Sequence, residues 1–222
     1  MGTVDVVRQR RSVAELHALD PFAGGGLGAP EVWWCVPTDA AIVLGSRQAP
    51  ATVDRVACDN RGLAVVRRRS GGGAVLIRPD AVVWIDLVAP HGVAPDDVRG
   101  AMVWAGRLWE SALRDVGALD RLATTVHEGG MVGSAWCDLV CFAGTGPGEV
   151  LTPAGKLVGL SQRRTRNGIR VQGMVHRRAL SDDAVAVLAG PLPPEPLPRP
   201  ETLPGVDAEA VAVALARAMT PA

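Results

Sequence analysis

The chain has 222 residues, and its 23 basic and 23 acidic side chains give a formal net charge of zero. This length suits one ordinary domain with at most a small appendage, and a neutral chain is not built as a whole to bind nucleic acid or a membrane surface. The four cysteines form no CxxC pair and have no zinc-type histidine spacing, which predicts a reduced, cytosolic protein without a metal site. No apolar run approaches the ~18 residues of a membrane span.

The first part of the chain is expected to form one short helix followed by strands. Ser12 and Glu15 fit a capping box, so a helix is predicted from there to about Leu19. Short runs of β-branched and aromatic residues then predict five strands. These strands are expected at Val32–Val36, Ala41–Gly45, Leu63–Val66, Ala74–Ile77 and Val82–Val88.

A longer amphipathic helix is predicted in the middle of the chain. Pro95 and the acids Asp96 and Asp97 open it, and Gly117 ends it. Its apolar residues recur at helical spacing, which indicates that one face packs on a sheet. Further strands are expected at Leu139–Ala143, Glu149–Leu151, Lys156–Ser161 and Ile169–Val175.

Strands before and after one helix, without regular alternation, predict an α+β fold rather than a doubly wound one. We expect a catalytic domain at residues 1–190 and a linker at 191–205, where proline is dense. Residues 206–222 are expected to carry a C-terminal helix, with an Ala- and Val-rich stretch at Asp207–Ala218.

The most informative segment reads Arg67-Arg68-Arg69-Ser70-Gly71-Gly72-Gly73-Ala74-Val75. Glycine permits positive φ and lets a ligand approach bare N–H groups, at a cost of about 0.5–1 kcal/mol relative to alanine. Guanidinium groups bind phosphate or carboxylate through two parallel hydrogen bonds. The segment therefore predicts an anion site, with phosphate as the favoured anion. The alternative is a glycine-rich turn beside incidental surface arginines.

A second segment, Gly155–Arg164, contains Lys156 between Gly155 and Gly159. It lacks the glycine and the Ser or Thr that a P-loop needs, which excludes an NTPase of that type. A lysine on such a strand can project into a cleft and offer its charge to a phosphate or an oxyanion, although a lone lysine is more often a solvated surface residue. Residues 61–78 and 156–178 form two acid-free basic islands, which favours an anionic ligand shared between them.

Together the two segments resemble the motifs of the lipoate-protein ligase family, which is related to biotin protein ligases, and Ile42–Gln48 resembles a third motif of that family. The resemblance spans roughly residues 30–180. It implies a mixed, mainly antiparallel sheet packed by helices, similar to the biotin/lipoate protein ligase (class II aminoacyl-tRNA synthetase-like) fold. The activity it implies is attachment of lipoate, or a related medium-chain acyl group such as octanoate, to a carrier lysine through an acyl-adenylate made from ATP with Mg. No tightly bound cofactor is expected.

The resemblance also implies roles for individual residues. Arg67 or Arg68 would lie near the phosphate, and Lys156 would contact the carbonyl and phosphate of the activated acyl group. The carrier would be the lipoyl domain of a 2-oxo acid dehydrogenase or the glycine-cleavage carrier protein. The substrate-binding residues implied in this way are Arg67, Arg68, Ser70, Gly71, Gly72, Gly73, Ala74, Gly159, Ser161 and Gln162.

A different mechanism is implied by Cys141-Phe142, which resembles the Cys-Phe of family members that are octanoyltransferases. Cys141 would then take the acyl group from a carrier protein and carry it as a thioester, and nearby cations would favour its nucleophilic thiolate form. The alternative is a buried, inert cysteine.

The chain also departs from the family pattern, with Leu76-Ile77-Arg78 after the glycines, Gly148 before Glu149, and Gln172-Gly173-Met174. These departures leave open a third hypothesis, a non-catalytic protein that binds an acyl-adenylate or a carrier domain. His127 and His176 have no catalytic partner in the pattern, and each is expected to be structural.

Overall fold

The computed structural model describes residues 3–24 and 27–220; residues 1, 2, 221 and 222, at the ends of the expected domain and C-terminal helix, lie outside the described part. The strands are β1 (Asp5–Arg11), β2 (Glu31–Pro37), β3 (Ala41–Leu44), β4 (Ala64–Arg67), β5 (Val75–Ile77), β6 (Val82–Pro90), β7 (Thr125–Val126), β8 (Val150–Thr152), β9 (Gly155–Thr165) and β10 (Gly168–His176). The helices are α1 (Val13–Ala18), α2 (Arg55–Asp59), α3 (Val98–Asp115), α4 (Ser181–Val185) and α5 (Ala208–Met219), with 3₁₀ turns at Pro50–Thr52 and Cys141–Ala143.

Two sheets organise the fold. The larger has seven strands in the order β1-β2-β6-β10-β9-β8-β7, and the smaller has three in the order β4-β3-β5. The β1–β2 and β3–β4 pairs are parallel, and the other strand pairs are antiparallel. The structure therefore confirms the predicted α+β class and its mixed, mainly antiparallel sheet.

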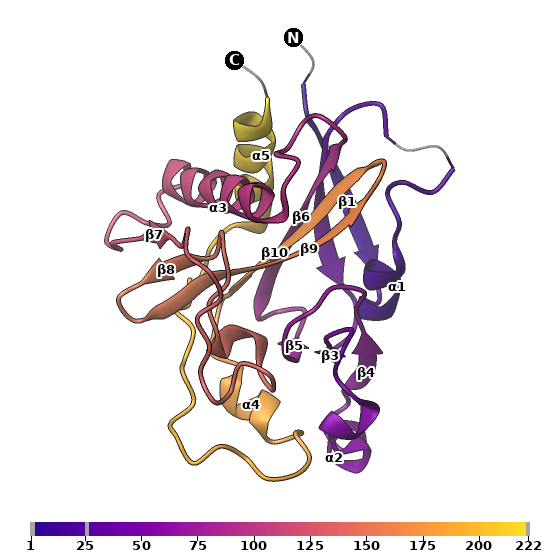
Figure 1. Cartoon of the computed structure of the whole chain (residues 1–222), viewed down its shortest axis with the longest axis vertical. Helices are drawn as coiled ribbons and strands as arrows, with labels where there is room; N and C mark the ends of the chain where they lie inside the picture. Colours follow the sequence, from indigo (N-terminus) through magenta and orange to yellow (C-terminus); the bar gives the residue numbers. More distant parts are fainter. Residues whose placement is uncertain (1–2, 25–26, 221–222) are drawn as a thin grey trace.

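The two faces of the large sheet are covered differently (Figure 1). Helices α3 and α5 pack on one face, where Trp109 and Leu113 of α3 and Leu215 of α5 join a single hydrophobic core with Val171 of β10. A second core, which includes Leu16 of α1 and Ile42 of β3, lies toward the small sheet. The candidate site lies on this second side, where Trp84, Phe142 and Met174 of the second core line a pocket.

Local sequence signals account for the helix ends. Ser12 Oγ accepts a hydrogen bond from Glu15 N at 3.3 Å, and Ser12 N donates to Glu15 Oε2 at 2.9 Å, which confirms the capping box. Asp97 Oδ1 caps α3 by accepting from Gly100 N at 2.7 Å. Gly117, with φ of 73°, follows the end of this helix in the left-handed conformation that glycine favours.

One predicted strand is wrong. Cys141–Ala143 form a 3₁₀ turn instead of part of a strand over Leu139–Ala143, and Val140 makes only an isolated bridge to Ala74. The run is apolar because both of its larger residues are buried: Val140 packs beside Gly73, and Phe142 packs against Gly159 and His176. Burial and not strand pairing therefore explains the pattern.

Some elements were not predicted, namely β1, β7, α2 and α4. Strand β1 contains Arg8, Arg10 and Arg11 and pairs along one edge only, with β2, so its sequence shows no buried alternation.

The proline-rich segment lies against the rest of the chain. Trp136 Nε1 donates to Glu195 O at 2.8 Å, and Glu201 N donates to Lys156 O at 2.9 Å. Beyond it, α5 packs beside α3 and shares its core. Across residues 3–24 and 27–220, no helix combines the length and the apolar character needed to cross a bilayer.

Candidate active site

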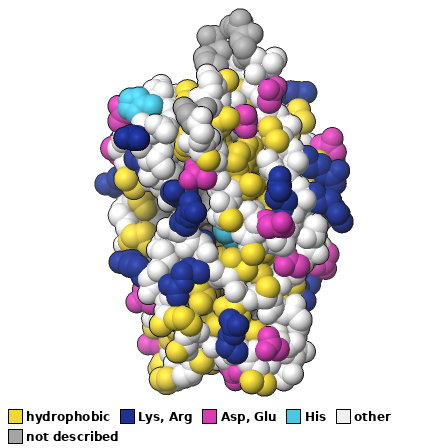
Figure 2. Space-filling model, turned by 90° about the vertical axis from the view of Figure 1, so that its right-hand side faces the viewer, with side chains coloured by type: hydrophobic (Ala, Val, Ile, Leu, Met, Phe, Trp, Pro, Cys, Tyr) yellow, Lys and Arg dark blue, Asp and Glu magenta, His cyan; other side chains and the backbone are white. Residues whose placement is uncertain are grey.

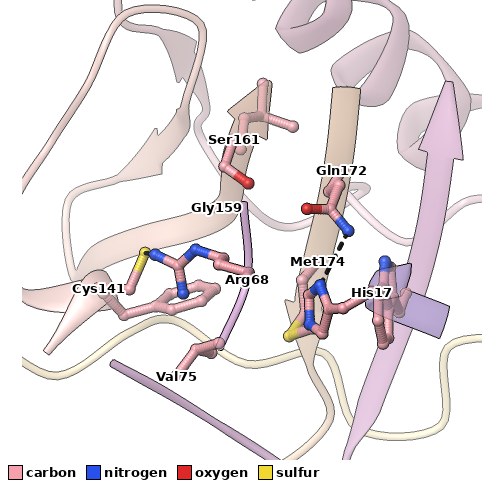
Figure 3. Close-up of a pocket in the computed structure, with 12 residues that line it drawn as sticks. His17, Arg68, Val75, Cys141, Gly159, Ser161, Gln172 and Met174 are labelled. Atoms are coloured by element: carbon pink, nitrogen blue, oxygen red, sulfur yellow. Dashed lines mark hydrogen bonds between the residues drawn. The ribbon is translucent and has the colours of Figure 1, made fainter. Parts of the chain in front are cut away.

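A mostly apolar pocket lies between β9, β10 and the turn that carries Cys141 (Figure 3). Gln172 and Met174 share one face of β10, and their neighbours across the strand pair are Ser161 and Gly159 of β9. Cys141 lines the pocket opposite these strands. The molecular face in Figure 2 has a recess near its middle, with apolar side chains and Lys or Arg side chains around it.

The glycine segment forms a tight loop around the Arg68 side chain. Arg68 Nη2 donates to Gly71 O at 2.7 Å and to Gly73 O at 2.9 Å. Gly72 has φ of 95°, and a Cβ there would lie 2.9 Å from Arg68 Nη2 and 3.6 Å from Cys141 Sγ. Because Gly72 has no side chain, the Arg68 guanidinium and the Cys141 sulfur can approach each other beside its backbone.

Main-chain hydrogen bonds join this loop to the cysteine turn. Ala74 N donates to Leu139 O at 2.8 Å, and Cys141 N donates to Ala74 O at 2.9 Å. A Cβ on Gly73 would lie 2.7 Å from the carbonyl carbon of Val140, so this approach also needs glycine. Two segments some 70 positions apart in sequence thus form one rigid wall of the pocket.

Arg68 is a buried cation, with 4% of its surface exposed. No carboxylate in the described part of the chain lies within ion-pair distance of its guanidinium, although Nη2 lies 3.8 Å from Cys141 Sγ. Buried charges in proteins are normally paired, because an isolated charge is costly to desolvate. The site therefore favours an anion at the Cys141 end of the pocket, supplied by a ligand or by the sulfur itself.

Lys156 behaves differently from the sequence-based expectation of a lysine projecting into a cleft. Its Nζ donates to Glu149 Oε1 at 2.8 Å and to Cys141 O at 2.9 Å, and its side chain is 3% exposed. Burial raises the pKa of Glu149, while the Lys156 ammonium and the N–H groups of Gly146 and Leu160 act in the opposite direction. Lys156 therefore holds the backbone of Cys141 in place from behind the pocket wall.

The other expected substrate-binding residues occupy different positions. Ser70 Oγ lies 3.1 Å from Ser161 Oγ at the pocket, whereas Arg67 is exposed and donates to Ser46 O at 3.0 Å. Gln162 points to the other side of β9 and donates to Val98 O at 2.9 Å. Of the expected site residues, Arg68, Cys141, Gly159 and Ser161 line the pocket, and Ser70 and Gly72 lie directly beside it. The expected residues outside the pocket lining are Arg67, Gly71, Gly73, Ala74, Lys156 and Gln162.

The second basic island also needs a correction. Besides Lys156, Arg170 is buried in an ion pair, with Nη2 2.6 Å from Asp86 Oδ2. Their partners, Glu149 and Asp86, lie outside residues 156–178. The absence of acids within that stretch therefore did not reveal that two of its cations are neutralised in the fold. These two cations are not available to share an anionic ligand with the first island.

Sequence analysis missed His17 as a pocket residue. His17 lies in the last turn of α1 and packs against Trp84 with ring centres 4.7 Å apart. Desolvation, helped by the charges of Arg170 and Arg68, lowers the pKa of His17 to about 3. A single histidine in a short capped helix carries no periodic signal, so only the fold reveals its position.

His176 is also buried, and it stacks on Phe142 with ring centres 4.3 Å apart. In the described part of the chain neither of its ring nitrogens has a hydrogen-bond partner. Desolvation, with a smaller contribution from the Lys156 charge, lowers the pKa of His176 to about 4.

We expect His176 to make the protein acid-sensitive. The pKa of His176 is lower in the folded than in the unfolded protein, so only the unfolded chain takes up its proton as the pH falls below 6.5. The contribution of His176 to folding stability is therefore complete above pH 6.5 and is lost as the pH falls toward about 4. The loss amounts to roughly 3 kcal/mol, since one pKa unit corresponds to about 1.4 kcal/mol. Melting temperatures at pH 8 and pH 4.5 should differ less in His176→Phe than in the wild type. An equal difference in both, or the same reduction in the exposed-site control His91→Phe, would contradict this assignment.

The fold and the pocket can be compared with known proteins. Residues 24–189 match the family described as the lipoyl protein ligase A/B catalytic domain. The chain belongs to this family. Within the lipoyl protein ligase A/B family, it is 28% identical over 159 residues to the octanoyltransferase LipM of Moorella thermoacetica. That match covers 71% of the chain but 56% of the relative, so the chain matches only about half the length of that protein.

Solved structures of lipoate and biotin ligases share the fold. A bipartite lipoate protein ligase from Thermoplasma acidophilum, studied with its E2 lipoyl domain, has a TM-score of 0.68 at 16% identity over 98% of this chain and 82% of its own. A lipoate-protein ligase A bound with ATP has a TM-score of 0.69 at 16% identity, covering 98% and 84%. A biotin acetyl coenzyme A carboxylase synthetase from Helicobacter pylori reaches 0.50 at 11% identity, covering 97% and 73%. These matches confirm the predicted fold.

Proposed function

We propose that the protein transfers lipoyl or a related medium-chain acyl group to a carrier lysine through a thioester on Cys141. The observation that carries this proposal is Cys141 Sγ at an apolar pocket, 3.8 Å from the buried Arg68 guanidinium, which bonds backbone carbonyls but pairs with no carboxylate among the described residues. A cation next to a cysteine favours the thiolate, which is the nucleophilic form. The similarity to an octanoyltransferase supports the same chemistry.

The reaction takes place in two balanced steps. The Cys141 thiolate attacks the carbonyl carbon of an acyl thioester, a new sulfur–acyl bond forms, and the donor leaves as a thiolate that takes up a proton. The neutral amine of the carrier lysine then attacks the Cys141 thioester, an amide forms, and the cysteine is released as the thiolate while the amine loses a proton to solvent. Arg68 stabilises the thiolate at the start and at the end.

Lys156 and Glu149 are proposed as positioning residues in this scheme. Lys156 Nζ holds the Cys141 carbonyl at 2.9 Å, and its charge is matched by Glu149. A fixed turn keeps the sulfur aimed at the pocket, which reduces the entropy cost of reaching the reactive geometry.

A lipoate ligase that uses ATP is the second candidate. Arg68 favours it too, because the same buried cation can pair with the phosphate of an acyl-adenylate as well as with a thiolate. Arg67, Gly71 and Gly73 remain proposed contacts of such a ligand. Such a ligase would take up Mg together with ATP.

The acceptor we propose is the lysine of a lipoyl domain or of a glycine-cleavage carrier protein. A structural neighbour is described together with its E2 lipoyl domain, which supports this partner class.

Acyl-lysine formation on a lipoyl domain separates the hypotheses. We expect product from an octanoyl or lipoyl thioester donor without ATP. Product formed only from the free acid with Mg-ATP would show the ligase instead. If neither donor gives product, the binding-protein hypothesis is supported, and a carrier-domain affinity measurement on the same samples tests that result directly.

A further inference from the structure

The segment Ile42–Gln48 ends in a tight turn beside the pocket wall. Gln48 N donates to Gly45 O at 3.1 Å, which closes this turn after β3. Gly45 is buried and Gln48 is half-buried, whereas Ser46 and Arg47 between them are exposed. All of these residues lie outside the pocket lining, so the turn acts on the site only through the segments that it contacts.

Gly45 and Ser46 hold this turn against the glycine segment. Ser46 N donates to Ser70 O at 2.9 Å. A Cβ on Gly45 would overlap the carbonyl oxygen of Gly72, so the backbones approach this closely only because the residue is glycine. The turn is therefore packed directly on the loop that surrounds the Arg68 side chain.

Gln48 joins the same turn to the segment before Cys141. Its Nε2 donates to Asp138 O at 2.8 Å and to Leu139 O at 3.3 Å, and its Oε1 accepts from Gly45 N at 2.9 Å. The amide fits in one orientation only, because the reverse would place Oε1 against two carbonyl oxygens. One side chain thus bridges two loops that are 90 positions apart in sequence.

The cysteine turn is held from two sides by these contacts. Lys156 Nζ donates to Cys141 O at 2.9 Å at one end of the turn, and Gln48 holds the other end. A connected set of hydrogen bonds restrains a backbone more than its separate members do, because each bond keeps its neighbours in place. Within this frame the Cys141 sulfur lies 3.8 Å from the Arg68 guanidinium (Figure 3).

We propose that Gln48 is a positioning residue that keeps the Cys141 sulfur beside Arg68. It acts through the backbone, since its side chain bonds main-chain atoms of both loops. The effect on the sulfur follows from these contacts alone, whereas the consequence for acyl transfer rests on the proposed function. Because Gln48 lies outside the pocket lining, its loss is expected to slow the reaction of Cys141 and to leave binding of the acyl group intact.

Alkylation of Cys141 by iodoacetamide, followed by peptide mass spectrometry, tests the position of the sulfur without any acyl transfer. Gln48→Met keeps a side chain of similar length and removes its hydrogen bonds. We expect the alkylation rate to fall about fivefold. The reason is that the sulfur no longer stays beside Arg68, and a neighbouring cation is typical of reactive cysteines.

A double variant separates positioning from a general loss of stability. If Gln48 acts through the contact between the sulfur and Arg68, Gln48→Met should slow alkylation by less than about twofold when Arg68 is already methionine. Independent effects would instead multiply. Arg47→Met changes an exposed position of the same turn and should react as the wild type does. All rates are measured well below the melting temperature of each variant.

The alkylation results decide the proposal whether or not the protein transfers acyl groups. Gln48→Asn, whose amide is one methylene closer to the backbone, provides the same test if Gln48→Met does not fold. An unchanged or faster alkylation rate would overturn the proposal, and so would an effect that multiplies with that of Arg68→Met.

Acyl transfer from an octanoyl thioester provides the second readout. We expect kcat to fall by a factor similar to the alkylation rate at an unchanged KM, because only the placement of the nucleophile is altered. An unchanged kcat in a protein that does acylate Cys141 would contradict the positioning role. Coupled alkylation rates in a protein that never acylates Cys141 would refute the proposed function alone and leave the role of Gln48 standing.

Discussion

Replacing Lys156 with methionine is expected to lower the free energy of unfolding by about 3–5 kcal/mol. The substitution removes the partner of Glu149, whose side chain is 4% exposed, and leaves an uncompensated carboxylate in the core. It also removes the hydrogen bond to the Cys141 carbonyl. In a chain of this size, we expect the melting temperature to fall by roughly 10 °C or more, measured by circular dichroism.

The double variant Lys156→Met with Glu149→Leu serves as the matched comparison. Removing both charges leaves no isolated ion, so much of the lost stability should return. Acyl transfer should stay low, because the Cys141 turn remains without its anchor. If the single and the double variant have equal melting temperatures, the unpaired Glu149 carboxylate is not the cause of the lost stability. The pairing of Lys156 with Glu149 would then not be how Lys156 stabilises the fold.

Arg68→Met is expected to slow alkylation of Cys141 at pH 7 by about tenfold, the factor that ~1.4 kcal/mol represents. The guanidinium lies 3.8 Å from Sγ, so the variant removes a cation next to the sulfur, and a neighbouring cation is typical of cysteines that react with iodoacetamide. The rate is measured by mass spectrometry of the intact protein below its melting temperature. Arg67→Met is the control, since Arg67 is exposed and contacts Ser46 O instead.

Arg68 also holds the carbonyls of Gly71 and Gly73, so a structural effect must be separated from a charge effect. Arg68→Lys keeps the charge and loses most of these bonds. We expect it to regain part of the alkylation rate while remaining less stable than the wild type. If Arg68→Lys reacts as slowly as Arg68→Met, the guanidinium acts through the loop alone, and its assignment to the sulfur is wrong.

The sequence predicted the fold where its signals were local. The capping box at Ser12, the cap at Asp97 and the glycine at the end of α3 determine helix ends within a few residues, and the structure confirms them. Apolar runs predicted most strands. The apolar run around Cys141 led to a wrong strand prediction. Val140 in this run is buried through its contact with the segment around Ala74, and these two segments are far apart in sequence.

The pocket could be predicted only in part, for the same reason. Arg68 and Cys141 were recognised from their motifs, but their proximity depends on how Gly72 lets two loops meet. The chain's single lysine, Lys156, was also recognised, yet its pairing with Glu149 depends on the β8–β9 hairpin and the turn before it. His17 reaches the pocket only because Arg170 holds the end of α1 on β10, which no local pattern encodes.

The central claim is that Cys141 carries the acyl group, and intact-mass spectrometry after incubation with an octanoyl thioester tests it most directly. The chain's only lysine is buried, so an adduct on an exposed lysine of this protein cannot imitate the result. We predict one octanoyl adduct that is removed by neutral hydroxylamine, persists in Cys137→Ala, and is absent from Cys141→Ala. An adduct of the same extent in Cys141→Ala, or none in a wild type that still acylates a lipoyl domain, would contradict the thioester mechanism.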